Sequence, residues 1–150
     1  MKSALRFETN SDEETRALGS RLAALLPRSG VVLLIGDLGA GKTTLTKGIA
    51  EALGAAPADE VSSPTFTLIH EYGDPVRIYH VDLYRLDTSE EARRVGLEEL
   101  FERPALTLIE WGERFPELMP EERVEIRIEH AGEDRRTIML SLPGASKPLS

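Results

Sequence analysis

The chain has 150 residues, and its 26 acidic against 18 basic residues give a net charge of −8 and a pI near 5.0. This length fits one domain, and so acidic a surface repels nucleic-acid phosphates, so we expect no DNA binding and contact with RNA only through a partner. The absence of cysteine excludes disulfides and sulfur-ligated zinc, and without a signal-peptide core or a membrane-length apolar run we expect a cytoplasmic protein that does not enter a membrane.

The first half of the chain predicts two strand–helix pairs. Leucines at helical spacing follow Ser11 and Asp12, either of which can cap a helix, and Pro27 stops that helix. The continuous apolar run that comes next, between two glycines, is typical of a strand buried on both faces of a parallel sheet. The expected elements are a strand at 5–8, a helix up to Pro27, a strand at 31–35 and a helix at 42–53 that ends at Gly54.

The second half predicts more strands around one helical stretch. Thr88 or Ser89 opens that stretch, and Gly96 breaks or bends it. The strand before it looks half exposed, because Arg77 and His80 interrupt its apolar pattern. The expected elements are strands at 65–71 and 76–82 around a turn at 72–75, a helical stretch up to residue 101, and strands at 105–110, 124–129 and 137–142, the last two joined by a turn at 132–134.

Together these elements predict one α/β domain over residues 1–143. The alternation of strands and helices indicates parallel strands, and the late hairpin adds antiparallel ones, so we expect a mixed sheet flanked by helices in three layers. Residues 144–150 are rich in glycine, serine and proline and are expected to form a short flexible tail.

The strongest motif runs from Gly36 to Thr43 and fits the P-loop pattern G-x-x-x-x-G-K-[ST]. Glycines let successive N–H groups curl around phosphates, and the following helix N-terminus adds partial positive charge. Lys42 reaches the β- and γ-phosphates, and the Thr43 hydroxyl binds Mg²⁺. An apolar strand precedes the motif and a helix follows it, as this chemistry requires. The motif predicts a P-loop NTPase-like fold that binds a nucleoside triphosphate.

Two carboxylates compete for the acidic role that Mg²⁺ and hydrolysis need at the end of a neighbouring strand. Asp82 ends one predicted strand and Glu110 ends a more continuously apolar one. Either residue alone would be interpreted as a helix cap or as the partner of a surface arginine. Beside a P-loop both can serve, one at the metal and the other on the attacking water, and the residues themselves leave open which one contacts the metal.

Three weaker features have a structural and a functional interpretation. The hydroxyl-rich segment at 62–67 is either an ordinary loop or a switch that senses the γ-phosphate. Trp111, directly after Glu110, either lies near the P-loop or anchors the core. The pairs at 93–94 and 135–136 are arginines expected on solvated faces, from which one can still reach a phosphate or an acidic partner.

The nucleotide and the reaction follow from which motifs are present. No Asn-Lys-x-Asp sequence occurs, so ATP is favoured over GTP. A small-molecule kinase is the rival enzyme, but no arginine-rich lid or acceptor site stands out. A nucleotide-sensing interaction module without meaningful turnover is the second alternative.

Four blocks of sequence resemble the TsaE (YjeE) family, small ATPases of bacterial tRNA threonylcarbamoyladenosine synthesis. The blocks are GDLGAGKTT at 36–44, VSSPTFTL at 61–68, HVDLYRL at 80–86 and IEW at 109–111. The resemblance implies an accessory ATPase of low intrinsic turnover that supports the TsaB–TsaD complex in the t6A modification of tRNA adenosine 37. It also implies that the chain contacts tRNA only indirectly and does not itself transfer the threonylcarbamoyl group.

The resemblance also implies a role for each matching residue. Catalysis falls to Lys42, Asp82 and Glu110, with Asp82 in the Walker B position, and Mg²⁺ to Thr43 and Glu110. The switch comprises Ser63, Pro64, Thr65 and Thr67. The ATP contacts are Asp12, Thr15, Gly36, Gly39, Ala40, Gly41, Lys42, Thr43, Thr44, Asp82, Trp111 and Gly132.

Overall fold

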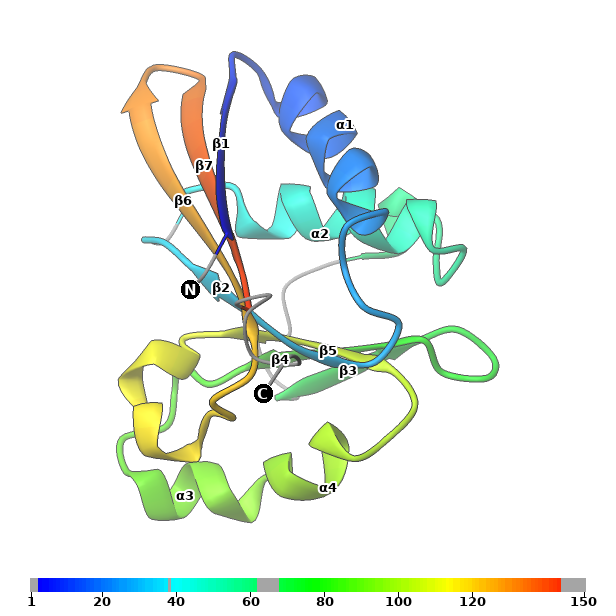
Figure 1. The fold of residues 1–150 in the computed structure, drawn as a ribbon, viewed down its shortest axis with the longest axis vertical. Coiled ribbons are helices and arrows are strands. Elements are labelled where there is room, and N and C mark those ends of the chain that lie inside the picture. Colours follow the sequence, from blue (N-terminus) through cyan, green and yellow to red (C-terminus); the bar gives the residue numbers. More distant parts are fainter. Residues whose placement is uncertain (1–2, 38, 62–67, 144–150) are drawn as a thin grey trace.

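A seven-stranded mixed sheet organises the chain (Figure 1), of which the computed structural model describes residues 3–37, 39–61 and 68–143. The strands lie in the order β1-β7-β6-β2-β5-β4-β3. The four strands β6, β2, β5 and β4 are parallel to one another, and antiparallel strands extend the sheet on both sides. Their bounds are β1 Ser3–Thr9, β2 Gly30–Ile35, β3 Ile69–Tyr72, β4 Ile78–Asp82, β5 Leu106–Glu110, β6 Val124–Gly132 and β7 Arg135–Leu142.

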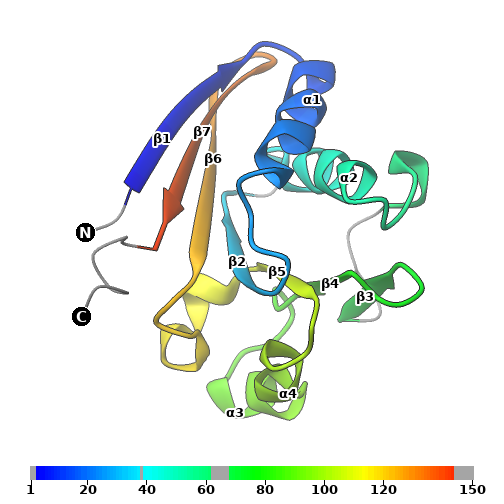
Figure 2. The same cartoon turned by 45° about the vertical axis from the view of Figure 1, so that its right-hand side comes forward.

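Helices cover both faces of the sheet and give it three layers (Figures 1 and 2), which confirms the predicted fold class. One face carries α1 and α2, and the other carries α3, α4 and two short 3₁₀ turns. The bounds are α1 Asp12–Ala23, α2 Lys42–Ala52, α3 Ser89–Arg94 and α4 Leu97–Phe101, with 3₁₀ turns at Ala58–Glu60, Gly112–Arg114 and Pro116–Leu118.

The core therefore consists of two buried clusters, separated by the sheet. Alternate residues of β2 belong to each, because successive side chains of a strand point to opposite faces. Val32 and Leu34 pack under α1 and α2, whereas Val31 and Leu33 pack with the residues of α3 and α4. The unbroken apolar run of this strand is thus explained by burial on both sides, as its sequence predicts.

The contact between α1 and α2 places the start of α1 beside the P-loop. Gly19 and Gly48 lie where the two helices meet, and a Cβ on either would collide with main-chain atoms of the other helix. Backbones can approach this closely only at glycine. The N-cap Ser11, whose hydroxyl accepts from the Glu14 N–H at 3.1 Å, starts the helix.

Strand β4 differs from its expectation. His80 is fully buried and Tyr79 is 5% exposed, so the prediction of a half-exposed strand is wrong. The cause is topological, because β4 lies between β5 and β3 rather than at the edge. Its apolar residues belong to both buried clusters, Ile78 to one and Tyr79 and Val81 to the other. Arg77, which suggested exposure, precedes the strand.

The other predicted turns and breaks are compared with the structure at Gly96, at the hairpin turn and at the start of β3. Gly96 has φ of 92° and divides the predicted helical stretch into α3 and α4. The turn near residue 132 joins β6 to β7 as expected. Strand β3 begins at Ile69, and the predicted strand residues 65–67 and the tail at 144–150 lie outside the described residues. Within the described ranges no helix has the length and apolarity needed to cross a bilayer.

Candidate functional site

The P-loop connects the end of β2 to the start of α2. Gly36 follows the strand where a Cβ would approach the Ile128 carbonyl oxygen of β6 to 2.6 Å, so only glycine fits. Gly41, with φ of 112°, is the N-cap of α2 and provides no side-chain cap. The first turn of this helix contains no acidic residue. Its N–H groups and its dipole therefore form an end of the helix that can bind an anion.

Lys42 opens α2 and turns its side chain back across the loop. It is 5% exposed, and its Nζ donates to the Gly36 carbonyl oxygen at 2.7 Å. The same Nζ lies 3.8 Å from Oε1 of Glu110 and 4.1 Å from the ring centroid of Trp111. A carbonyl, a carboxylate and an aromatic face thus hold the ammonium group over the loop.

Glu110 is held by a fully buried histidine. It is 3% exposed at the end of β5, and its Oε2 lies 2.6 Å from Nε2 of His80 on the adjacent strand β4. A carboxylate accepts, so Nε2 carries the proton and donates it to this hydrogen bond. Nδ1 of His80 is buried and has no partner among the described residues. His80 therefore holds one Glu110 oxygen, and the other faces Lys42.

Asp82 lies directly across from Glu110 in the parallel pairing of β4 and β5. One carboxylate oxygen accepts the Tyr84 N–H at 2.9 Å. Burial raises the pKa of Asp82 above its usual value and the Glu110 charge adds to this rise, while the Tyr84 N–H, Lys42 and His80 oppose it. The two predicted acids thus meet at one edge of the sheet, in different surroundings.

A cavity of about 410 Å³ opens over the P-loop. Its lining joins the loop and the start of α2 with Glu110, with the start of α1 and with one residue of β7. A larger cavity, of about 500 Å³, lies between the end of α1 and β6 and contains none of the motif residues. The smaller cavity is lined by Asp12, Gly39, Gly41, Lys42, Thr43, Thr44, Glu110 and Arg136.

Not every predicted ATP contact lies at this cavity. Thr15 is buried, and its hydroxyl is already bonded to the Ser11 carbonyl oxygen at 3.1 Å and to the Thr9 hydroxyl at 2.7 Å. Gly132 lies in the exposed hairpin turn and is not among the described lining residues. The predicted switch residues Ser63, Pro64, Thr65 and Thr67 lie outside the described residues.

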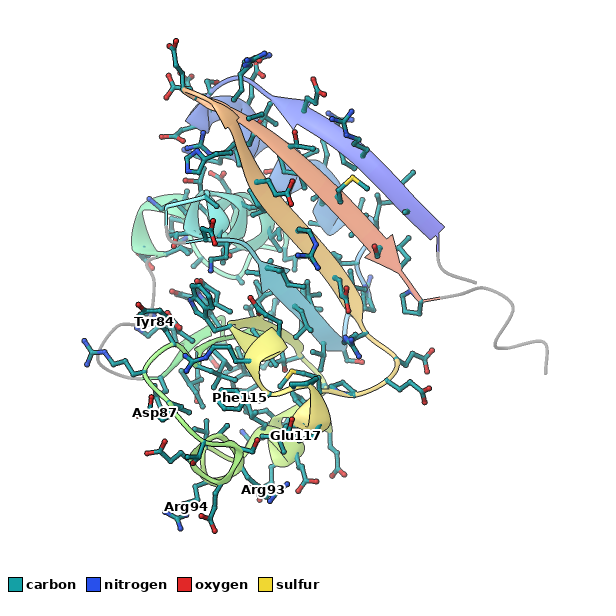
Figure 3. The ribbon with its side chains drawn as sticks, turned by 90° about the vertical axis from the view of Figure 1, so that its left-hand side faces the viewer. Tyr84, Asp87, Arg93, Arg94, Phe115 and Glu117 are labelled. Atoms are coloured by element: carbon teal, nitrogen blue, oxygen red, sulfur yellow. The ribbon has the colours of Figure 1, made fainter. Side chains whose placement is uncertain are left out.

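Trp111 lies between Lys42 and an exposed tyrosine. Its ring centroid is 5.1 Å from that of Tyr84, which is 48% exposed on the segment that follows β4 (Figure 3). Arg114 fixes this segment by donating to the Tyr84 carbonyl oxygen at 2.6 Å. Trp111 itself has φ of 68°, which few non-glycine residues adopt. A third cavity, lined by Tyr84, Asp87 and Trp111 among others, adjoins this ring pair.

The sequence predicts solvated faces for four arginines and lets one of them reach a phosphate, but it does not indicate which one lies at the site. Arg93 and Arg94 are exposed on α3 as expected (Figure 3), but Arg136 is only 9% exposed, so its expected place on a solvated face is wrong. The period of two in β7 contains the missing signal, because Arg136 shares a face with the buried Ile138 and Leu140.

In the P-loop class of α/β proteins, a strand with parallel neighbours on both sides runs into a glycine loop, and a lysine opens the next helix; β2, the loop and α2 form this arrangement. The family model described as "Threonylcarbamoyl adenosine biosynthesis protein TsaE" matches residues 9–138. The chain belongs to the TsaE family.

Individual relatives agree with this assignment. A Bacillus subtilis protein named "tRNA threonylcarbamoyladenosine biosynthesis protein TsaE" is 44% identical over 141 residues, covering 93% of this chain and 87% of the relative. Proteins of the same name from Rickettsia bellii and Treponema pallidum are 41% and 36% identical, covering 85% and 91% of this chain and 88% and 100% of their own lengths. The crystal structure of Bacillus subtilis YdiB superposes with a TM-score of 0.77 at 39% identity, covering 99% of this chain and 92% of that one.

Proposed function

We propose that this chain binds Mg-ATP, hydrolyses it slowly, and thereby supports the TsaB–TsaD complex in the t6A modification of tRNA. The observation that carries the proposal is the arrangement of Lys42 over the P-loop, within 4 Å of a Glu110 carboxylate that a buried histidine holds in place. P-loop proteins need this pairing of a lysine with a strand-end acid around the terminal phosphates.

The residues present fit a magnesium ion. Thr43 and Glu110 both line the cavity, and a hydroxyl and a carboxylate are hard oxygen ligands. No cluster of three or more His, Cys, Asp or Glu side chains that could hold a metal lies within the described ranges. Mg²⁺ does not need one, because it keeps several waters and takes substrate phosphates as ligands. The ion, when bound, neutralises charge that develops on the phosphates.

In this proposal the two acids, Glu110 and Asp82, have different roles in hydrolysis. Lys42 binds the β- and γ-phosphates, and Glu110 with Thr43 holds the metal. Asp82 accepts a proton from the water that attacks the γ-phosphorus as the bond to the β-phosphate oxygen breaks, which yields ADP and phosphate. The raised pKa of Asp82 makes it a better proton acceptor than an ordinary carboxylate once it is ionised.

The part in tRNA modification rests on family membership and on charge. The relatives' name refers to tRNA threonylcarbamoyladenosine biosynthesis, and a net charge of −8 suits a component that acts through protein partners. The chain is then a cytoplasmic accessory ATPase, contacts tRNA only indirectly, and leaves the group transfer to TsaB–TsaD.

The test is ATP hydrolysis by the purified chain, alone and with the cognate TsaB–TsaD pair. We expect slow turnover alone and a clear change when the pair is added. Turnover that the pair leaves unchanged would contradict the role in tRNA modification. Turnover that requires a metabolite acceptor would instead establish a kinase, and nucleotide binding without turnover would establish a sensor.

A further inference from the structure

Arg136 brings the C-terminal hairpin into contact with the P-loop. It lies on β7, on the strand face that also carries Ile138 and Leu140, and 91% of its surface is buried as a consequence. Its Nε donates to the carbonyl oxygen of Ala40 at 2.8 Å, although 96 residues separate the two in sequence. The guanidinium group also lines the cavity that contains Lys42 and Glu110.

The charge of Arg136 has no counter-ion in the described part of the chain. Its other hydrogen bonds run from Nη1 to the carbonyl oxygens of Glu133 and Arg135, both at 3.2 Å. All three acceptors are neutral main-chain oxygens. Asp12 and Glu110 also line the cavity, but no described carboxylate lies within ion-pair distance of the guanidinium.

A buried arginine in this state is suited to bind an anion. Desolvating a charge is costly unless an opposite charge or several hydrogen bonds compensate. Arginine has five N–H donors, and these three hydrogen bonds leave Nη2 without an acceptor among the described residues. The two N–H groups of Nη2 are therefore free to donate charge-assisted hydrogen bonds to the oxygens of a phosphate.

The part of the P-loop that Arg136 contacts indicates which phosphates this residue can reach. Lys42 and Glu110 form the end of the cavity where the γ-phosphate belongs. Arg136 instead lies against Ala40 and Gly41, with Nε 3.6 Å from the point where a Cβ of Gly41 would lie. The N–H groups of this part of a P-loop cradle the α- and β-phosphates.

We propose that Arg136 is a phosphate-binding residue, whose Nη2 N–H groups donate to the α- and β-phosphates of the nucleotide while Nε holds the P-loop at Ala40. The inference rests on the proposed nucleotide binding and goes further, because it makes the β6–β7 hairpin part of the nucleotide site. It assigns to Arg136 an interaction made equally with ATP and ADP, so this arginine contributes to affinity for both.

The test measures the Kd of ADP and of ATP, the latter in excess EDTA to prevent turnover, by calorimetry on the full chain. In Arg136→Gln both affinities should fall by the same factor, about tenfold to a hundredfold, the size of hydrogen bonds to charged groups. Arg136→Lys keeps the charge without the fork and should lie between the wild type and Arg136→Gln. Arg135→Gln is the matched control, because it makes the same charge change at an exposed neighbour and should keep the wild-type affinity.

The outcomes separate this inference from the proposed function. Wild-type affinity in Arg136→Gln, or a loss confined to ATP, would overturn the assignment to the α- and β-phosphates. Arg136→Gln binding as tightly as Arg136→Lys would also overturn it, because the charge would then contribute nothing to binding. If Arg136→Gln melts too low to measure, unchanged affinity in Arg136→Lys overturns the inference. Failure of the wild type to bind either nucleotide would instead contradict the proposed function.

Discussion

The two sides of the cavity are built in different ways. On one side Lys42, Glu110 and His80 come from the P-loop and two neighbouring parallel strands, and form a dense buried network of ionisable groups. On the other side Asp12 comes from the start of α1 and Arg136 from an antiparallel strand far along the chain. The first side concentrates groups that act on a terminal phosphate, whereas the second carries one cation held only by main-chain oxygens. We therefore expect changes on the first side to affect turnover and changes on the second to affect affinity.

The largest effect should come from Lys42 on the network side. Lys42→Ala removes the charge that stabilises the terminal phosphates, so we expect ATP hydrolysis to fall by about a hundredfold or more. A steady-state phosphate-release assay measures this, with circular dichroism to show that the fold persists. Lys47→Ala, in the same helix but away from the cavity lining, is the control and should keep wild-type turnover. Full activity in Lys42→Ala would disprove the site.

His80 should have the next largest effect, although it does not line the cavity. His80→Gln disturbs the 2.6 Å contact that orients Glu110, and losing such a support of a metal ligand typically costs about 10–100-fold in metal affinity or activity. We expect a higher Mg²⁺ concentration for half-maximal hydrolysis, with ADP affinity in the absence of metal nearly unchanged. A merely structural role would lower the melting temperature and leave the Mg²⁺ requirement as it was.

Replacing Asp82 should raise the stability of the fold by a small amount, although it abolishes turnover. Because burial raises its pKa in the folded state, ionised Asp82 destabilises the fold, and that penalty appears as the pH rises through the folded pKa. Asp82→Asn removes the penalty and preserves an acceptor for the Tyr84 N–H. We expect a slightly higher Tm at pH 7, a gain that vanishes in acid, where the carboxyl is protonated in both states. Hydrolysis should be lost, and a lower Tm at pH 7 would contradict the assigned cost of ionisation.

The same contrast explains how much could be predicted from the sequence. The P-loop is local, so its motif and flanking elements predict the loop, Lys42 and the strand-end acids, and the structure brings these together. The sequence pattern places His80 on a half-exposed strand, because the pairing with β3 and β5 that buries this residue is not visible in the local sequence. The position of Arg136 at the cavity depends on the register of β7 against β6 and on where the hairpin ends. Two adjacent arginines in the sequence specify neither of these. Residues placed by long-range pairing are therefore the ones that sequence reasoning misplaced.

The smallest expected effect is a change in the fluorescence of Trp111, the chain's one tryptophan, which reports on both sides of the cavity. The Trp111 ring touches Nζ of Lys42, so a phosphate that draws the ammonium group away changes the ring's electrostatic surroundings. We expect the fluorescence of Trp111 to change on adding ADP or ATP, with the larger change for ATP, because Lys42 reaches both the β- and the γ-phosphate and ADP has only the first of them. In Arg136→Gln the titration should shift to higher nucleotide concentration and reach the same end point, since the ring's own neighbours are intact. A reduced end point at saturation would mean that the hairpin also sets the position of Lys42, and the two sides would then not be separable.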